Sequence, residues 1–177
     1  MLVFYGASLF AQAVPAQPRT VSQVIDSWVT DSERLLVPAA EAMPEDKYSF
    51  APSNGEFAGV RSFAGQIKHL AAANYQLGAG ALGEEPPPGT ASESAPDSIK
   101  TRQQIMDYLK GSFACLHRAA AALNENNMND PIASKDNRTR LHLLIDALVH
   151  SSNHYGQIVE YLRMNNIVPP ASRQEAH

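Results

Sequence analysis

The stretch that most constrains the fold of this chain is residues 141–170, LHLLIDALVHSSNHYGQIVEYLRMNNIVPP. Its apolar residues recur mostly every three or four positions, which is the periodicity of an amphipathic helix. Asn166 tolerates the left-handed conformation that closes many helices, and Pro169 and Pro170 prevent continuation. The stretch therefore predicts a long C-terminal helix that must bury its apolar side against other elements.

Two histidines of this predicted helix, His150 and His154, are four residues apart. On a helix this spacing places both imidazoles on one face, one turn above the other. Helices use the same spacing to offer two nitrogen ligands to one metal ion. Such a pair also arises by chance, so a metal site is indicated only if a third ligand is found elsewhere in the chain.

The composition bounds the remaining possibilities. A chain of 177 residues fits one domain with a sizeable core. The net charge is −4 and there is no run of Lys or Arg, so nucleic acid is not an expected partner. The single cysteine, Cys115, excludes an internal disulfide and a CxxC site, and its Ala-rich surroundings predict a buried thiol that packs as a small hydrophobe.

The N-terminal segment has two interpretations. Residues 2–13, LVFYGASLFAQA, have the length of a signal-peptide h-region and end in the small-x-small pattern Ala11-Gln12-Ala13, without a basic n-region before them. This predicts that residues 1–19 are an export leader and that the protein is exported or periplasmic. The alternative is an apolar arm packed on the domain of a cytoplasmic protein. The run is too short to span a bilayer.

Three further helices are expected before the last one. The first starts at Thr20 or Ser22 and ends near residue 37, or near residue 43 if it continues through Pro38, with Trp28 on its inward side. The second covers about residues 56–78, with Phe57 on its buried side, and the third runs from residue 97 or 98 to about 124. The Pro- and Ser-rich residues 84–96 are expected to form a mobile surface loop.

Four helices without a strand pattern predict an all-α protein, an up-down four-helix bundle over residues 20–170 with a short tail at 171–177. Bundles build metal sites from side chains on facing helices, so His69 of the second helix is the expected partner of His150 and His154. Three imidazoles leave a fourth coordination position open, as in catalytic zinc sites. No catalytic residue beyond this set can be named from the pattern.

Several residues close to the histidines are expected to position the imidazoles or the helix that carries them. Gly156, inside a strong helix and two residues after His154, is expected to allow a close backbone approach. Candidate groups for orienting the imidazoles are Gln157, Tyr155 and Asn74. The other histidines are not candidate ligands, because His142 is two turns from His150, His117 adjoins Arg118, and His177 is terminal.

The last helix resembles that of the DinB-like (damage-inducible) superfamily in its His150-x-x-x-His154-x-Gly156-Gln157 sequence, its Tyr161-Leu162-Arg163 and its Pro169-Pro170 ending. Residues 43–48, MPEDKY, are similar to the family's loop after the first helix. Residues 61–70, which contain His69, are similar to its second-helix segment. The resemblance covers about residues 21–170, and the three histidines with these flanks are specific only together.

This resemblance implies a metal-binding four-helix bundle with zinc or nickel on His69, His150 and His154, and a homodimer. It also implies relatives that include thiol-dependent S-transferases and a mycothiol-dependent maleylpyruvate isomerase, beside many members without an assigned reaction. The expected function is a metal-dependent transferase or hydrolase in which the ion activates a thiol or water toward an unknown small-molecule substrate. The alternative is a non-catalytic bundle with a structural metal or a cavity for a small ligand, for which a closed coordination shell would speak.

Overall fold

The computed structural model describes residues 17–90, 94–132 and 137–173. Within these ranges the chain forms four α-helices: α1 (Val21–Ala42), α2 (Phe63–Leu82), α3 (Arg102–Ala122) and α4 (Arg140–Met164). Two short 3-10 turns, η1 (Glu45–Lys47) and η2 (Pro170–Ser172), follow α1 and α4. The described part contains no strand, so the predicted all-α four-helix bundle is confirmed.

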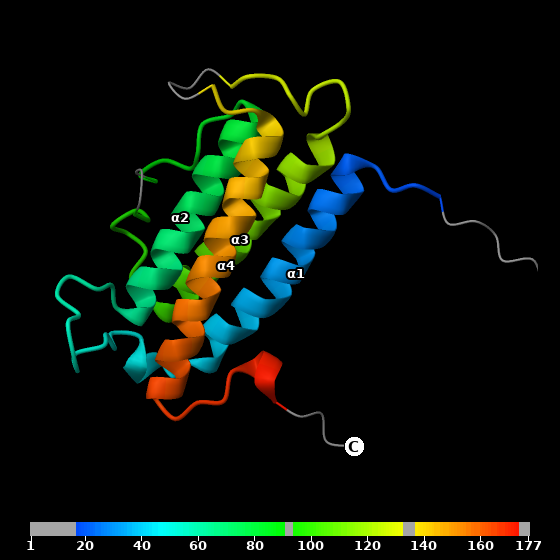
Figure 1. The fold of residues 1–177 in the computed structure, drawn as a ribbon. Helices are drawn as coiled ribbons and strands as arrows, with labels where there is room; N and C mark the ends of the chain where they lie inside the picture. Colours follow the sequence, from blue (N-terminus) through cyan, green and yellow to red (C-terminus); the bar gives the residue numbers. More distant parts are fainter. Residues whose placement is uncertain (1–16, 91–93, 133–136, 174–177) are drawn as a thin grey trace, which may run out of the picture.

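The order of the helices in space differs from their order in the chain (Figure 1). Both α1 and α2 pack against α3 and α4, so the consecutive pairs α1/α2 and α3/α4 lie diagonally across the bundle. Helix α4 runs antiparallel to α2, since Gln66 contacts Gln157 whereas the carbonyl of Ala81 accepts from Arg140.

Helices α2 and α3 run parallel to each other. Asn74 of α2 bonds to Ser112 of α3, and Gly78, one turn further along α2, lies against Cys115 and Leu116, further along α3. The described parts of the long connection, residues 83–90 and 94–101, lead back along the bundle before α3 begins, as Figure 1 shows. The up-down order therefore holds from α1 to α2 and from α3 to α4, and the step from α2 to α3 is a crossover.

Each helix begins at a hydroxyl residue whose side chain accepts a hydrogen bond from the backbone N–H three positions later. These N-cap residues are Thr20, Ser62, Thr101 and Thr139. At the end of α4, Asn166 adopts φ 59°, the left-handed conformation that was expected for it. The helix boundaries therefore follow local side-chain chemistry that is visible in the sequence.

The predicted start of the second helix at residue 56 is wrong. Gly55 and Gly59 have φ values of 120° and 77°, which a helix cannot accommodate, and α2 begins only after the N-cap Ser62. Phe57 consequently lies in the loop with 37% of its surface exposed and does not belong to the buried side of α2. Helix α3 likewise begins later than expected, because Thr101 and Gln104 form a reciprocal capping box there.

Helix α1 continues through Pro38 to Ala42, which is the longer of the two predicted forms. Its inward side differs from the prediction at Trp28, which is 59% exposed. Ile25 and Val29 are buried, whereas Val24 is 38% exposed. The helix is rotated so that the core receives the smaller β-branched residues, and the indole lies on the outer surface.

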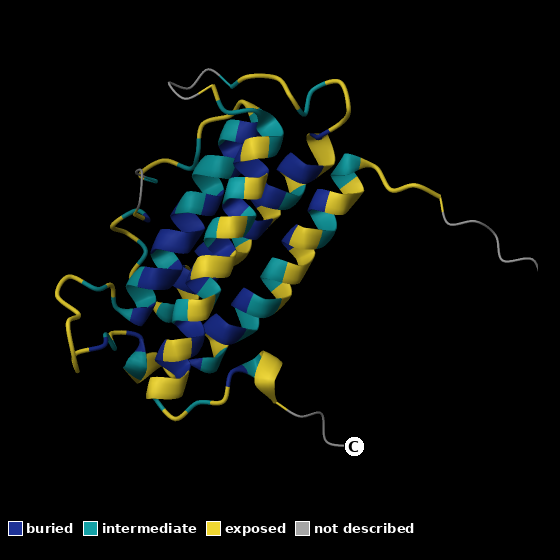
Figure 2. Cartoon of the chain, in the orientation of Figure 1, coloured by how far each residue is buried: buried dark blue, intermediate teal, exposed yellow. Residues whose placement is uncertain are grey.

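The core of the bundle lies between the four helices, on the sides that are dark blue in Figure 2. Its largest fully buried side chains are Phe63, Phe113, Leu36, Met43, Ile67, Leu70, Leu109, Leu116, Leu144, Ile158 and Leu162. Cys115 is buried, as predicted, and burial raises the pKa of its thiol. Three polar side chains of α2 are buried near this core, namely Gln66, His69 and Asn74.

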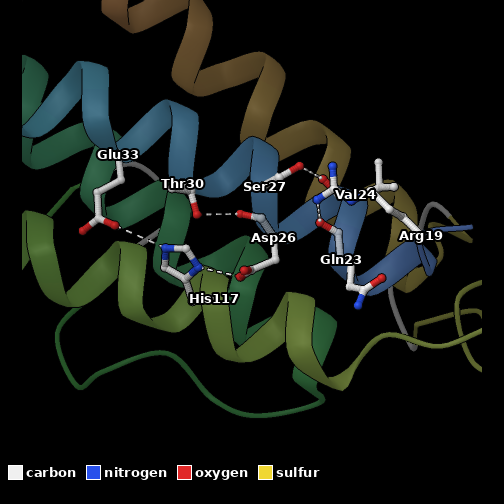
Figure 3. A network of polar contacts seen from close by, with 8 residues as sticks. All are labelled: Arg19, Gln23, Val24, Asp26, Ser27, Thr30, Glu33 and His117. Atoms are coloured by element: carbon white, nitrogen blue, oxygen red, sulfur yellow. Dashed lines mark hydrogen bonds and ion pairs between the residues drawn. The ribbon is translucent and has the colours of Figure 1, made fainter. Parts of the chain in front are cut away.

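His117 of α3 joins two acidic residues of α1 (Figure 3). Its Nδ1 lies 2.6 Å from a carboxylate oxygen of Asp26, and its Nε2 lies 3.2 Å from one of Glu33. Desolvation lowers the pKa of His117, but hydrogen bonds and charge from both carboxylates outweigh it, so the pKa is raised overall. His117 therefore has a structural role between α1 and α3.

No helix in the described ranges is long and apolar enough to cross a membrane. The expected leader or arm lies mostly outside the described residues, which begin at Gln17. The expected mobile loop of residues 84–96 is interrupted by the undescribed residues 91–93. On either side of this gap, Thr90 lies 2.7 Å from the Tyr108 hydroxyl and Ala95 is buried.

Candidate metal centre

The three predicted histidines come together between α2 and α4. His150 Nε2 lies 3.2 Å from His69 Nε2 and 3.1 Å from His154 Nε2. One ligand atom from each residue lies within 4.8 Å of the others. His69 and His154 are buried, and His150 is half-buried. The antiparallel packing of α2 against α4 thus brings together residues separated by 81 positions in the chain.

This spacing of nitrogens suits a small divalent cation. Zinc–imidazole bonds of about 2.0–2.1 Å at tetrahedral angles hold two nitrogens about 3.3 Å apart. The two Nε2 separations, 3.1 and 3.2 Å, are close to that value. Imidazole nitrogen is a suitable ligand for zinc, nickel and copper, whereas magnesium and calcium prefer oxygen ligands. The side chains are therefore close enough together to hold a metal ion.

Gln66 determines which nitrogen of His154 faces the cluster. Its Oε1 lies 2.8 Å from His154 Nδ1, so the neutral imidazole donates Nδ1–H to the amide oxygen. The Nε2 atom of His154 then carries the lone pair that a metal ion requires, and it is directed at His150. Convergent lone pairs of this kind are unfavourable by themselves and are stabilised by a cation.

A chain of amides holds Gln66 in this orientation. Gln66 Nε2 donates to Gln157 Oε1 at 2.8 Å, and Gln157 Nε2 donates to Asn153 Oδ1 at 3.0 Å. Gln157, a predicted orienting group, therefore contacts Gln66 and orients the imidazole of His154 only through it. Gln66 itself was missed by the sequence analysis, although it lies three residues before His69 and so shares a helix face with it.

His154 is held in the neutral form that binds metal. Desolvation by burial, together with positive charge on His150, His69 and Arg61, lowers its pKa to about 4. Protons therefore compete little with a metal ion for its Nε2 at neutral pH.

The other predicted supporting residues lie elsewhere. Asn74 is buried but bonds to Ser112 and Ser151 within the core. Tyr155 lines a cavity of about 70 Å³ between α1 and α4, together with Leu35 and other side chains. Gly156 is exposed, and a Cβ placed there would meet nothing within 4 Å, so the expected close backbone approach is wrong. Its surface position means that a side chain there has no core contact to make.

A surface pocket lies beside one member of the cluster, His69. His69 is part of the wall of a cavity of about 350 Å³, with Arg61, Ser62, Gly65 and Lys68 of the α2 start and Ser94, Ala95 and Asp97 of the connection to α3. This volume is at the lower end of the range for small-molecule sites, about 300–1,000 Å³. A small molecule in this cavity would lie beside the His69 imidazole.

Comparison with known proteins supports the fold. A solved structure of a conserved protein from Enterococcus faecalis superposes with a TM-score of 0.67, at 16% sequence identity, over 83% of this chain and 98% of that one. This similarity concerns the fold alone. No curated protein matches the sequence.

The sequence profile of the DinB superfamily matches residues 29–158, a span that includes His69, His150 and His154. The match covers well over half of the chain, and the four-helix architecture and the three-histidine cluster agree with it. The chain therefore belongs to the DinB superfamily.

Proposed function

We propose that this protein is a metal-dependent enzyme, a transferase or hydrolase in which a thiol or water adds to an electrophilic small molecule beside His69, His150 and His154. The observation that carries the proposal is the composition of the cluster. Within the described ranges, the group able to hold a metal consists of three histidines without a cysteine or carboxylate. Three protein ligands with one open position are typical of catalytic rather than structural zinc sites.

Five side chains have separate roles at the proposed site. The three histidines hold the ion, Gln66 keeps Nδ1 of His154 protonated, and Gln157 fixes the amide of Gln66. Burial of His69 and His154 limits access of bulk water, and the pocket at His69 admits a substrate. When bound, a divalent ion supplies Lewis-acid chemistry that lowers the pKa of a thiol or water. Zinc and nickel both accept imidazole ligands.

The alternative is a structural metal or a ligand-binding bundle without catalysis. A structural metal would require the fourth position to be filled by a protein group, and the cluster does not provide a further histidine, cysteine or carboxylate within the described part of the chain. The half-buried state of His150 also keeps the cluster near the surface. Both features support the catalytic proposal.

A homodimer is proposed as the assembly. Helices α1 and α4 pack side by side, and each exposes a pair of large apolar residues one turn apart. Val24 and Trp28 are 38% and 59% exposed on α1, and Ile145 and Val149 are 46% and 63% exposed on α4. Apolar surface of this kind on a stable bundle favours association, and the second copy presents the same pairs in return.

Export is proposed from the sequence of residues 2–13. A mature chain beginning at Val14 would retain all four helices and the three histidines. N-terminal sequencing of the protein from its native host tests this proposal, since retention of Met1 would contradict it.

The enzymatic proposal is tested with untagged, chelator-stripped protein reloaded with zinc or nickel. Thiol consumption in the presence of an alkylating electrophile and hydrolysis of an activated ester are measured in parallel. We expect turnover in one of these assays, lost in His150→Ala and retained in the control His142→Ala, whose histidine is exposed on the same helix. A loaded protein that melts at a higher temperature but turns over neither substrate class would favour the structural alternative.

A further inference from the structure

A second cavity lies between α2, α3 and the connection that joins them. It has a volume of about 540 Å³, within the usual range of small-molecule sites, about 300–1,000 Å³. Its described wall consists of residues from α2, from α3 and from positions 84–88 of the connection. None of these residues lines the pocket beside His69, and the histidine cluster lies between α2 and α4. The metal centre therefore does not account for this cavity.

The connection is tied to the helices on both sides of the cavity. The N–H of Glu84 donates to the carbonyl of Ala79 on α2 at 2.9 Å, and the Glu84 carboxylate pairs with Arg118 of α3. Further along the chain, Thr90 Oγ1 lies 2.7 Å from the hydroxyl of Tyr108 on α3. These contacts hold the segment between Glu84 and Thr90 at a fixed position beside the two helices.

Three consecutive prolines, residues 86–88, form part of the wall between these ties. Proline fixes φ near −65° and has no N–H donor, so a run of prolines is stiff and extended. Such a segment does not fold inwards to fill the space behind it. The cavity is therefore preformed, as small-molecule sites usually are.

Tyr75 of α2 reaches across the backbone of α3 at Gly111. A Cβ at Gly111 would overlap the Tyr75 hydroxyl oxygen, so the Tyr75 side chain can lie here only because Gly111 has none. Glycine in the middle of a helix is unfavourable relative to alanine. Both residues line the cavity, and within the described ranges the Tyr75 hydroxyl makes no hydrogen bond and is not enclosed by protein. This hydroxyl is therefore available to a ligand.

The other groups of the wall favour an uncharged ligand. Burial raises the pKa of the Tyr75 hydroxyl and of the Cys115 thiol, so both carry their protons at neutral pH. The Arg118 guanidinium is already paired with Glu84, and the exposed carboxylate of Glu85 disfavours an anion. Most of the remaining described wall is alanine and proline, which contact apolar and aromatic surface favourably.

We propose that this cavity is a second small-molecule site, which binds an uncharged aromatic molecule with one hydroxyl or carbonyl group. Proline side chains pack well against aromatic rings. The Tyr75 ring, whose centroid lies 4.9 Å from that of Tyr108, adds aromatic surface to the same wall. The polar group of the ligand exchanges a hydrogen bond with the Tyr75 hydroxyl. Binding at this site does not require a metal ion.

Calorimetric titration of 2-naphthol into the full-length protein tests the proposal, with 2-naphthoate as the anionic counterpart. We expect 2-naphthol to bind at one site and 2-naphthoate to bind at least about ten times more weakly, because its carboxylate meets Glu85 and an Arg118 that is already paired. Tyr75→Phe should weaken 2-naphthol binding about five-fold, through the loss of one hydrogen bond. Absence of 2-naphthol binding up to its solubility limit, or tighter binding of 2-naphthoate, would overturn the proposal.

A bulky substitution at Ala114 locates the binding. Ala114 is exposed and lines the cavity, so Ala114→Trp should fold normally and weaken 2-naphthol binding at least about ten-fold by filling the space. The control is Ala121→Trp, the same substitution at an exposed position of α3 outside the described wall. Circular dichroism melts confirm that both variants are folded. Equal affinity of Ala114→Trp and the original protein would place 2-naphthol elsewhere and reject the site.

Gly111→Ala tests the position of the Tyr75 hydroxyl. The added methyl group displaces the hydroxyl, so the affinity for 2-naphthol should fall at least as far as in Tyr75→Phe. The control is Gly156→Ala on α4, where the new Cβ meets nothing within 4 Å and the affinity should stay the same. Unchanged affinity in Gly111→Ala would reject the hydrogen bond assigned to Tyr75.

Measurements with and without zinc separate this inference from the proposed function. Zinc-loaded protein, metal-stripped protein and His150→Ala should all bind 2-naphthol with the same affinity, since His150 does not line the cavity. If this binding persists while the loaded protein turns over no substrate, the second site stands without the enzymatic proposal. Loss of 2-naphthol binding in His150→Ala would place the probe at the metal centre and reject the second site.

Discussion

Gln66 Oε1 lies 2.8 Å from His154 Nδ1, and this contact between α2 and α4 decides the tautomer of one imidazole of the cluster. An amide oxygen can only accept, so the proton resides on Nδ1 and the lone pair on Nε2. Gln66 is 2% exposed, which protects the contact from competition by water. We therefore expect the metal affinity of the cluster to depend on a residue that is not itself a candidate ligand.

The first prediction concerns the histidines. Untagged protein reloaded with zinc or nickel should contain one ion per chain, and His150→Ala or His154→Ala should abolish retention of the ion through gel filtration. Removing one of three ligands costs more than the ten- to hundred-fold loss typical of an orienting group. Elemental analysis provides the measurement, with His142→Ala as the matched control. A stoichiometry near zero for the original protein would reject the site.

The second prediction concerns Gln66. Gln66→Leu should lower zinc affinity about ten- to hundred-fold, because His154 loses the acceptor that directs its Nε2 toward the ion. Gln66→Glu should retain or increase affinity, since a carboxylate accepts the same Nδ1–H more strongly. Competition with a chromogenic chelator measures both. Gln103→Leu, an exposed position on α3 bonded to Asp107, is the control. Equal affinities for Gln66→Leu and the original protein would contradict the tautomer assignment.

The third prediction is a pH dependence that originates at His117. Its pKa is raised in the folded state, so its stabilising contribution is complete below the unfolded value of about 6.5 and is lost as the pH rises through the folded value. The melting temperature of His117→Gln should fall below that of the original protein at pH 5.5, and the difference should shrink toward pH 9. Because the partners are partly exposed, the contribution is at most about 1 kcal/mol, or about 2–4 °C.

Asp26→Asn provides the control for this pH dependence. It removes the carboxylate closest to His117 Nδ1, so it should reduce the pH-dependent difference between variant and original while leaving the imidazole in place. Taking differences between variants cancels the titration of the other histidines. A difference that grows toward alkaline pH would show that burial, rather than the two carboxylates, dominates at His117.

The fourth prediction concerns the proposed dimer. Trp28→Glu and Val149→Glu each place a charge in the exposed apolar surface of α1 and α4 and should shift the protein to a monomer in sedimentation velocity. Their melting temperatures at high dilution should change little, since neither side chain belongs to the core. Phe57→Glu, at an exposed apolar position in the loop before α2, is the control. A monomeric original protein would reject the dimer outright.

Much of the helical framework was predictable because it depends on local chemistry. Thr20 and Asn166 close helix ends through a hydrogen bond or a backbone conformation available within a few residues. The His150–His154 spacing likewise belongs to a single helix, so its shared face followed directly from helical geometry. Errors appeared where a periodic apolar pattern continued into a turn, as at Phe57, where two glycines with positive φ prevent a helix.

The position of Trp28 and the identity of Gln66 depended on the tertiary structure. Whether an apolar residue at the margin of a helical stripe is buried depends on the rotation of the helix against its neighbours, and that rotation is a property of the whole core. Gln66 and Gln157 are 91 residues apart, and no local pattern indicates that their amides meet.

Four amphipathic segments and three histidines, two of which share a helix face, follow from the order of the residues alone. The packing of the helices sets α2 parallel to α3 and antiparallel to α4, and this direction brings His69 to His150 rather than to another part of α4. Local propensity acts over one or two turns of helix, whereas the relative direction and register of helices result from the packing of all four buried faces at once. The convergence of the three Nε2 atoms is therefore a consequence of helix packing. The spacing of residues along the chain places only His150 and His154 on a common face.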